Sequence, residues 1–120
     1  MKKYIIPACI SMFIVFLLNS CAASVSYKSA AQSRPPKPEE YEIEVFHANE
    51  TPSKKNTTLG LISVDDSGFT INCSYDVVLG KAKEKAREIG ADAIKIVKIE
   101  SPDLFSSCYR IKVLAIAYDN

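Results

Sequence analysis

Hydrophobic and polar residues follow a period of two where the folded part of this chain is expected to begin. In residues 41–46, Tyr41, Ile43 and Val45 alternate with two glutamates, which predicts a half-buried β-strand. Three further runs, at residues 58–64, 93–100 and 108–118, are rich in β-branched residues and are bounded by polar or turn-forming segments. Each predicts a strand, and Gly60 predicts a bulge or a close approach of two backbones in the first of them.

Between the second and third of these strands the hydrophobic period changes to that of a helix. Apolar residues recur three or four positions apart, so they line one helical face: Val78, Ala82, Ala86 and Ile89. Ser74 is suited to cap the start of this helix, and Gly90 to end it in the left-handed conformation. The charged residues of the same segment predict a solvated face, and the two alanines predict a close approach to a sheet.

The order of these elements predicts the fold class. One helix among four strands gives a small α+β domain of order β-β-α-β-β, with the helix packed on a mainly antiparallel sheet. The domain is expected to occupy residues 41–120. Residues 21–40 contain no hydrophobic period and three prolines, so they predict a tether that reaches about 65 Å when fully extended.

The first 20 residues have the pattern of a signal peptide. Lys2 and Lys3 precede an apolar segment at residues 5–18, which is too short to span a bilayer core of about 30 Å. It ends in the sequence Leu18-Asn19-Ser20-Cys21, which resembles a bacterial lipobox, although Asn19 departs from the usual residue. The resemblance implies cleavage before Cys21 and lipid attachment to its thiol. The alternative is an ordinary signal peptide with an incidental cysteine.

Composition narrows the range of functions. After loss of Lys2 and Lys3 the chain carries 13 basic and 14 acidic side chains, so no basic surface for nucleic acid is expected. His47 is the only histidine, and no phosphate-binding loop or nucleophile motif occurs. We therefore expect no enzyme activity, no catalytic or metal site, no cofactor and no small-molecule substrate. Glu42 and Glu44 are interpreted as solvated residues of an edge strand.

Two cysteines remain once the signal peptide and Cys21 are set aside. Cys73 lies just before the helix and Cys108 opens the last strand, so the packing of helix on sheet would bring both to one end of the domain. In an exported protein the default interpretation of such a pair is a disulfide. Free thiols, or metal and redox chemistry, are the alternatives.

Residues 60–118 resemble the C-terminal domain of the RcsF family, outer-membrane lipoproteins that sense envelope stress. The resemblance rests on Gly60-x-Ile62-x-Val64, on Cys73, on residues 91–94 (Ala-Asp-Ala-Ile) and on Cys108-Tyr109-Arg110. It implies a Cys73–Cys108 disulfide and a lipoprotein that acts through protein contacts in the periplasm. The second disulfide of that family has no cysteines here.

These observations predict a lipoprotein held in the outer membrane through Cys21, with its domain facing the periplasm. Its expected role is that of an envelope sensor or protein-interaction module with an envelope protein as partner. The alternative is a structural or accessory envelope lipoprotein without a signalling role.

Overall fold

The computed structural model describes residues 24–65, 73–104 and 106–119, and it confirms the predicted α+β class. The element order is β-β-β-α-β-β: β1 (Ser24–Ser29), β2 (Glu44–Phe46), β3 (Asn56–Asp65), α2 (Tyr75–Glu88), β4 (Ala93–Glu100) and β5 (Arg110–Tyr118). The strands at 58–64 and 93–100 and the helix lie where the sequence predicted them. The expected first strand is shorter, and one strand precedes it.

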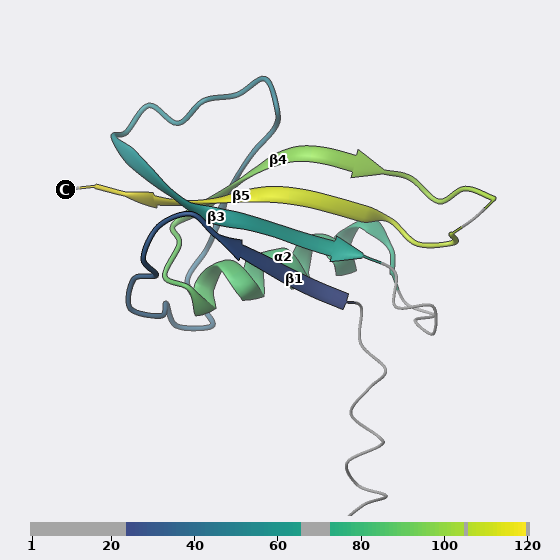
Figure 1. Ribbon diagram of the computed structural model, residues 1–120, viewed down its shortest axis with the longest axis horizontal. Coiled ribbons are helices and arrows are strands. Elements are labelled where there is room, and N and C mark those ends of the chain that lie inside the picture. The colour runs from purple at the N-terminus through teal and green to yellow at the C-terminus, as the bar shows by residue number, and fades with distance from the viewer. Residues whose placement is uncertain (1–23, 66–72, 105, 120) are drawn as a thin grey trace, which may run out of the picture.

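The strands form one sheet in the order β1-β3-β5-β4-β2. β1, β3, β5 and β4 pair antiparallel to their neighbours, and only β2 runs parallel to its neighbour β4. α2 lies across a single face of this sheet (Figure 1). Within the described residues no helix has the length and apolar character needed to cross a bilayer.

The expectation of a free tether up to residue 40 was wrong for residues 24–40. Ser24–Ser29 form β1, an edge strand paired with β3 over its whole length. The following segment is held against the end of the helix, where the Arg34 N–H donates to the Ile89 carbonyl and the Lys37 N–H to the Arg87 carbonyl. The folded domain therefore includes residues 24–40, and the three prolines do not keep this segment apart from it.

The predicted role of Gly60 is confirmed in both of its forms. The register between β3 and β5 shifts between Thr58 and Gly60, as at a β-bulge. On the other side β1 comes so close that a Cβ at Gly60 would overlap the Lys28 carbonyl oxygen and lie 2.6 Å from the Tyr27 ring. The Tyr27 hydroxyl also donates to the Leu59 carbonyl at 2.9 Å, which fixes the ring over this part of β3.

The helix packs on the sheet through the face that the sequence predicted. Val78, Ala82, Ala86 and Ile89 are all buried, and the two alanines have no exposed surface. Opposite them lie the inward side chains of β3, β4 and β5: Ile62, Val64, Ile94, Ile96, Ile111, Val113, Ala115 and Ala117. The small alanine side chains let the helix axis come close to the sheet. A helix of only 14 residues therefore covers the hydrophobic face of the long strands β3, β4 and β5.

The helix begins and ends as expected, with one difference. Ser74 occupies the N-cap position, but its side chain makes no capping hydrogen bond. Gly90 follows the C-cap with φ of 82°, the left-handed conformation that favours glycine. A Cβ there would also lie 2.5 Å from the Arg34 carbonyl oxygen. Gly90 thus ends the helix and admits the N-terminal segment beside it.

Gly60→Ala should destabilise the domain, because the added methyl group would overlap the Lys28 backbone and the Tyr27 ring. Overpacking of this kind costs roughly 1–3 kcal/mol in free energy of unfolding. Gly80→Ala is the matched control, since a Cβ at Gly80 meets nothing within 4 Å. Because Gly80 is an exposed position inside the helix, that change should stabilise the domain by about 0.5–1 kcal/mol. Urea unfolding measures both, and equal effects of the two changes would contradict the close approach of β1 to β3.

Candidate functional site

The predicted Cys73–Cys108 disulfide is present and closes one end of the domain. The Cα atoms are 5.1 Å apart, and both side chains are buried. The Tyr109 N–H donates to the Cys73 carbonyl at 3.2 Å, so the backbones beside the bridge are also joined. The sequence predicted this pair correctly because Cys73 lies just before the helix and Cys108 leads into β5.

Aromatic packing strengthens the same junction. The rings of Tyr75 and Tyr109 meet edge to face, with centroids 5.8 Å apart and planes at 70°. Each tyrosine is a near neighbour in sequence of one bridging cysteine. The start of α2 is therefore fixed to the start of β5 by a covalent bond and by a ring contact, a geometry worth about 0.5–1.5 kcal/mol beyond its buried area.

Beyond the bridge, the hairpin between β4 and β5 carries a chain of ion pairs. Arg110 contacts Glu100 at 2.9 Å and Asp103 at 3.1 Å, and Lys98 contacts Glu100 at 2.8 Å. The hydrogen bond and charge of Lys98 lower the pKa of Glu100, and Arg110 acts in the same direction. At the turn, the Asp103 N–H donates to the Ser106 carbonyl at 2.7 Å, and the Ser106 N–H donates to the Asp103 carboxylate at 2.9 Å. The turn is held by its own polar groups.

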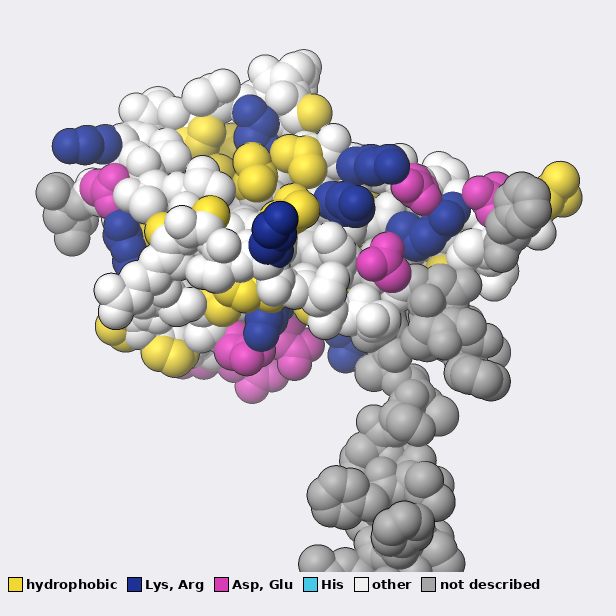
Figure 2. Space-filling view, in the orientation of Figure 1, with side chains coloured by type: hydrophobic (Ala, Val, Ile, Leu, Met, Phe, Trp, Pro, Cys, Tyr) yellow, Lys and Arg dark blue, Asp and Glu magenta, His cyan; other side chains and the backbone are white. Residues whose placement is uncertain are grey.

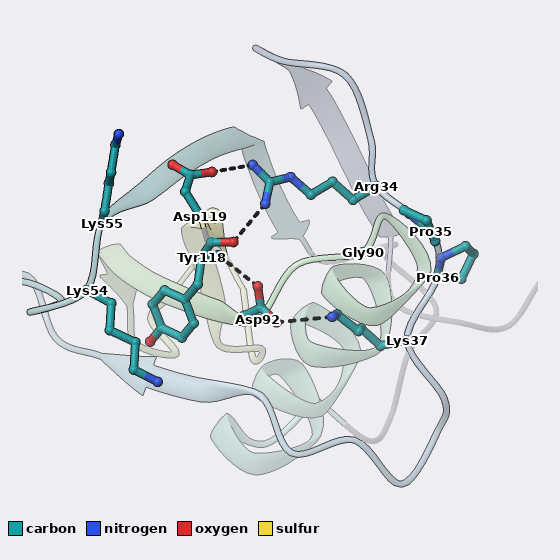
Figure 3. Close-up of a pocket in the computed structure, with 10 residues that line it drawn as sticks. All are labelled: Arg34, Pro35, Pro36, Lys37, Lys54, Lys55, Gly90, Asp92, Tyr118 and Asp119. Atoms are coloured by element: carbon teal, nitrogen blue, oxygen red, sulfur yellow. Dashed lines mark hydrogen bonds and ion pairs between the residues drawn. The ribbon is translucent and has the colours of Figure 1, made fainter.

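A polar cleft of about 800 Å³ lies at the opposite end of the domain (Figure 3). Its walls come from the N-terminal segment, the loop before β3, the turn after α2 and the end of β5. The lining residues are Arg34, Pro35, Pro36, Lys37, Lys54, Lys55, Gly90, Asp92, Tyr118 and Asp119. Most of them are polar or charged, so the cleft is suited to a charged group rather than to an apolar ligand.

Asp92 is the centre of the hydrogen bonds in this cleft. It accepts from the Tyr41 hydroxyl at 2.7 Å and from the Tyr118 N–H at 2.8 Å, and it pairs with Lys37 at 3.2 Å. Burial alone would raise the pKa of Asp92, but these three donors outweigh it and hold the pKa below its usual range. The hydrogen bond from the Tyr41 hydroxyl to Asp92 raises the pKa of Tyr41. Asp92 is thus a charged residue that joins the N-terminal segment to β5.

Arg34 makes a second junction in the same cleft. Its guanidinium donates to the Tyr118 carbonyl at 2.8 Å and pairs with the Asp119 carboxylate, as Figure 3 shows. Thr57 donates to the same carboxylate at 2.9 Å. The Arg34 and Thr57 hydrogen bonds lower the pKa of Asp119. The last residues of β5 are therefore tied both to β3 and to a segment 84 residues earlier in the chain.

Tyr118 completes the wall of the cleft. Burial and a hydrogen bond with Glu44 raise its pKa to about 12, so its hydroxyl stays protonated at every physiological pH. The Lys54 ammonium lies 4.8 Å from the centre of its ring, a cation–π geometry. The two carboxylates of the cleft, Asp92 and Asp119, are thus engaged with Lys37 and Arg34 of the N-terminal segment.

A third surface is the face of the sheet that α2 leaves open. The register places Leu61 of β3 opposite Leu114 of β5 on this face, with Lys28, Lys95 and Lys112 in the neighbouring positions. Both leucines are only partly buried. Figure 2 shows hydrophobic side chains gathered over the middle of the molecule, with Lys and Arg side chains around them.

The remaining predicted residues are distributed as follows. Cys21, the expected lipid attachment site, and the signal peptide lie outside the described residues. Glu42, Glu44 and His47 are exposed, at or beside the edge strand β2, as the sequence indicated. Among the described residues, no three His, Cys, Asp or Glu side chains lie together in a way that could hold a metal ion. The Asp92 network was not predicted, because its members are far apart in the sequence.

Reduction of the bridge, or Cys73→Ser, should lower the free energy of unfolding by roughly 2–4 kcal/mol. The bridge spans a sequence separation of 35 residues, and the entropy it removes from the unfolded chain is worth about 3.8 kcal/mol before strain. Hydrogen exchange should increase first at the start of α2. A reducing agent should not destabilise the Cys73→Ser variant further. Two alkylatable thiols at these positions in protein isolated from an oxidising envelope would contradict the bridge.

Asp92→Asn should change how stability depends on pH. Because the folded pKa of Asp92 is lowered, its contribution is complete above the pKa of the unfolded chain and is lost as pH falls through the folded pKa. The wild type should therefore lose more stability than the variant as the pH falls below about 5. At neutral pH the variant should be about 1–3 kcal/mol less stable. The exposed Glu40→Gln serves as control, and parallel pH profiles of wild type and Asp92→Asn would exclude this role.

No family model matches the chain, and no curated protein or solved structure is similar enough to it to count as a match. The resemblance to the RcsF family therefore rests on the residues quoted from the sequence.

Proposed function

We propose that this chain is an outer-membrane lipoprotein, anchored through Cys21, whose domain faces the periplasm and works as an envelope sensor or protein-interaction module. The observation that carries the proposal is the Cys73–Cys108 disulfide, which joins helix to sheet. Stable structural disulfides belong to oxidising compartments such as the bacterial periplasm. The bridge thus supports the same compartment that the signal peptide and lipobox pattern predict.

The chemistry of the described surfaces favours binding over catalysis. The carboxylates of the polar cleft are engaged with the N-terminal segment, and Tyr118 stays protonated. The open face of the sheet instead combines partly exposed leucines with Lys28, Lys95 and Lys112. Apolar side chains surrounded by lysines complement a partner that presents apolar residues among carboxylates. We therefore assign this face to an envelope protein with an acidic contact surface.

The second candidate function is a structural or accessory role without signalling. It is favoured by the number of bonds that fix both ends of the domain, which leave little scope for a change of shape. Deletion of the protein separates the two. An altered transcriptional response to envelope damage supports a sensor, whereas an unchanged response with a weakened envelope supports the structural role.

Cys21→Ala should abolish incorporation of labelled fatty acid and leave the signal peptide uncleaved, because acylation of the thiol precedes cleavage in lipobox proteins. Acyl chains contribute about 0.8 kcal/mol per buried CH₂, so two or three of them hold a protein firmly on a membrane. The mature wild type should fractionate with the outer membrane, since Ala22 and Ala23 lack the acidic character of inner-membrane retention signals.

Cys9→Ala is the matched control for this experiment. Cys9 lies within the expected signal peptide, so its removal should leave labelling and cleavage intact. Equal labelling of the wild type and Cys21→Ala would contradict the anchor.

A further inference from the structure

We propose that the β4–β5 hairpin, with Leu104 at its turn, lies in the surface of the membrane that holds the lipid anchor. This inference rests on the proposed anchoring at Cys21. It adds a second membrane contact, made by the folded domain itself, and it fixes which end of the domain faces the lipid. The ligand is a phospholipid surface.

The first observation is where exposed apolar side chains gather. Four large hydrophobic residues are exposed in the described part of the chain: Val25, Val97, Ile99 and Leu104. Val25 is one residue from the start of β1, Ile99 is near the end of β4, and Val97 lies in the half of β4 that β2 does not pair. Leu104 is 100% exposed. All four are in the half of the domain that carries the disulfide, and the polar cleft is at the other end.

The second observation is where the chain enters the domain. Three Cα–Cα steps separate Cys21 from Ser24, so the anchor lies within about 11 Å of the start of β1. The ladder places Ser24 opposite Asp65, and Val64 opposite Ile111, which pairs with Ile99. Three strand spacings, about 14 Å, therefore separate the start of β1 from the end of β4. The start of β1 and the β4–β5 hairpin are at the same end of the sheet (Figure 1).

The third observation is that the charged side chains nearest the turn are paired with one another. Arg110 pairs with Glu100 and Asp103, and Lys98 pairs with Glu100, so the two acidic groups and the two basic groups balance. The polar groups of Asp103 and Ser106 satisfy one another across the turn. Paired charges and satisfied backbone groups cost less to bring to a membrane interface than free ones.

A membrane fits these observations better than a second copy of the chain. The apolar side chains are spread over β1, β4 and the turn rather than gathered into one flat patch, so a single protein interface would leave some of them exposed. A bilayer extends across the whole end of the domain, so it can meet Leu104 together with the apolar residues near the start of β1 and the end of β4. The short connection to Cys21 holds that end against the lipid continuously, so weak contacts suffice.

The test uses the absence of tryptophan from the chain. Leu104→Trp places a single fluorophore at the turn, and Ser53→Trp places one in the exposed loop before β3 as the matched control. Both full-length proteins are produced with fatty-acid labelling and reconstituted into vesicles of phosphatidylethanolamine and phosphatidylglycerol. A fraction of the lipid carries bromine on the acyl chains. Both substituted positions are exposed, so circular dichroism should show an unchanged fold.

In labelled protein, Leu104→Trp emission should shift to shorter wavelength and lose intensity with brominated lipid, while Ser53→Trp emission changes in neither respect. Equal quenching of the two, or none, would overturn the hairpin contact and leave the anchor intact. A blue shift without quenching would place the turn against protein, a second copy included, and would also overturn it. Absence of fatty-acid label would remove the anchor and, with it, this inference.

A second variant guards against an effect of tryptophan itself. Leu104→Glu keeps the anchor but adds a charge at the turn. With the protein bound to vesicles, the backbone amides of the loop that joins β4 to β5 should exchange slowly in the wild type and fast in this variant. Equal exchange in both would count against the contact independently of fluorescence.

Discussion

The structure depends on keeping one short helix tightly on one face of a five-stranded sheet. Ala82 and Ala86 make that close contact possible, but they bury little area themselves, so the contact needs support at both ends of the helix. A covalent bond provides it at the start of α2, where Cys73 meets Cys108. Hydrogen bonds provide it at the end, where the N-terminal segment crosses beside Gly90. Loss of either support would leave that end of the helix held by side-chain packing alone.

The N-terminal segment has a larger role than its composition indicates. It adds the edge strand β1, then passes the end of α2 and reaches the polar cleft through Arg34 and Lys37. Asp92 and Asp119 bind it there, and these contacts lower the pKa of both carboxyl groups. A segment used in this way cannot also act as a long tether. An anchor at Cys21 would therefore hold the domain at the membrane surface, and this changes which surfaces of the domain remain available to a partner in the periplasm.

The two ends of the domain differ in the chemistry of their surfaces. The end near the start of β1 is closed by the disulfide and carries the exposed apolar residues. The far end carries the charged cleft. The open face of the sheet runs between them, with Leu61 and Leu114 among lysines. A domain oriented by its first end on a membrane would present this face and the cleft to proteins in the periplasm.

The sequence by itself determined the elements whose pattern is local. The helix face, the strands at 58–64 and 93–100, the stop at Gly90 and the bulge at Gly60 all follow from the spacing of residues along a few turns or one strand. It also identified the two cysteines, because each lies beside a predictable element end. Tertiary structure decided the rest. Val25 and Tyr27 alternate with polar residues, but a six-residue strand with little burial forms only because β3 offers it an edge. The Asp92 and Arg34 networks join residues up to 85 positions apart, and no local pattern shows which distant donor a carboxylate will meet.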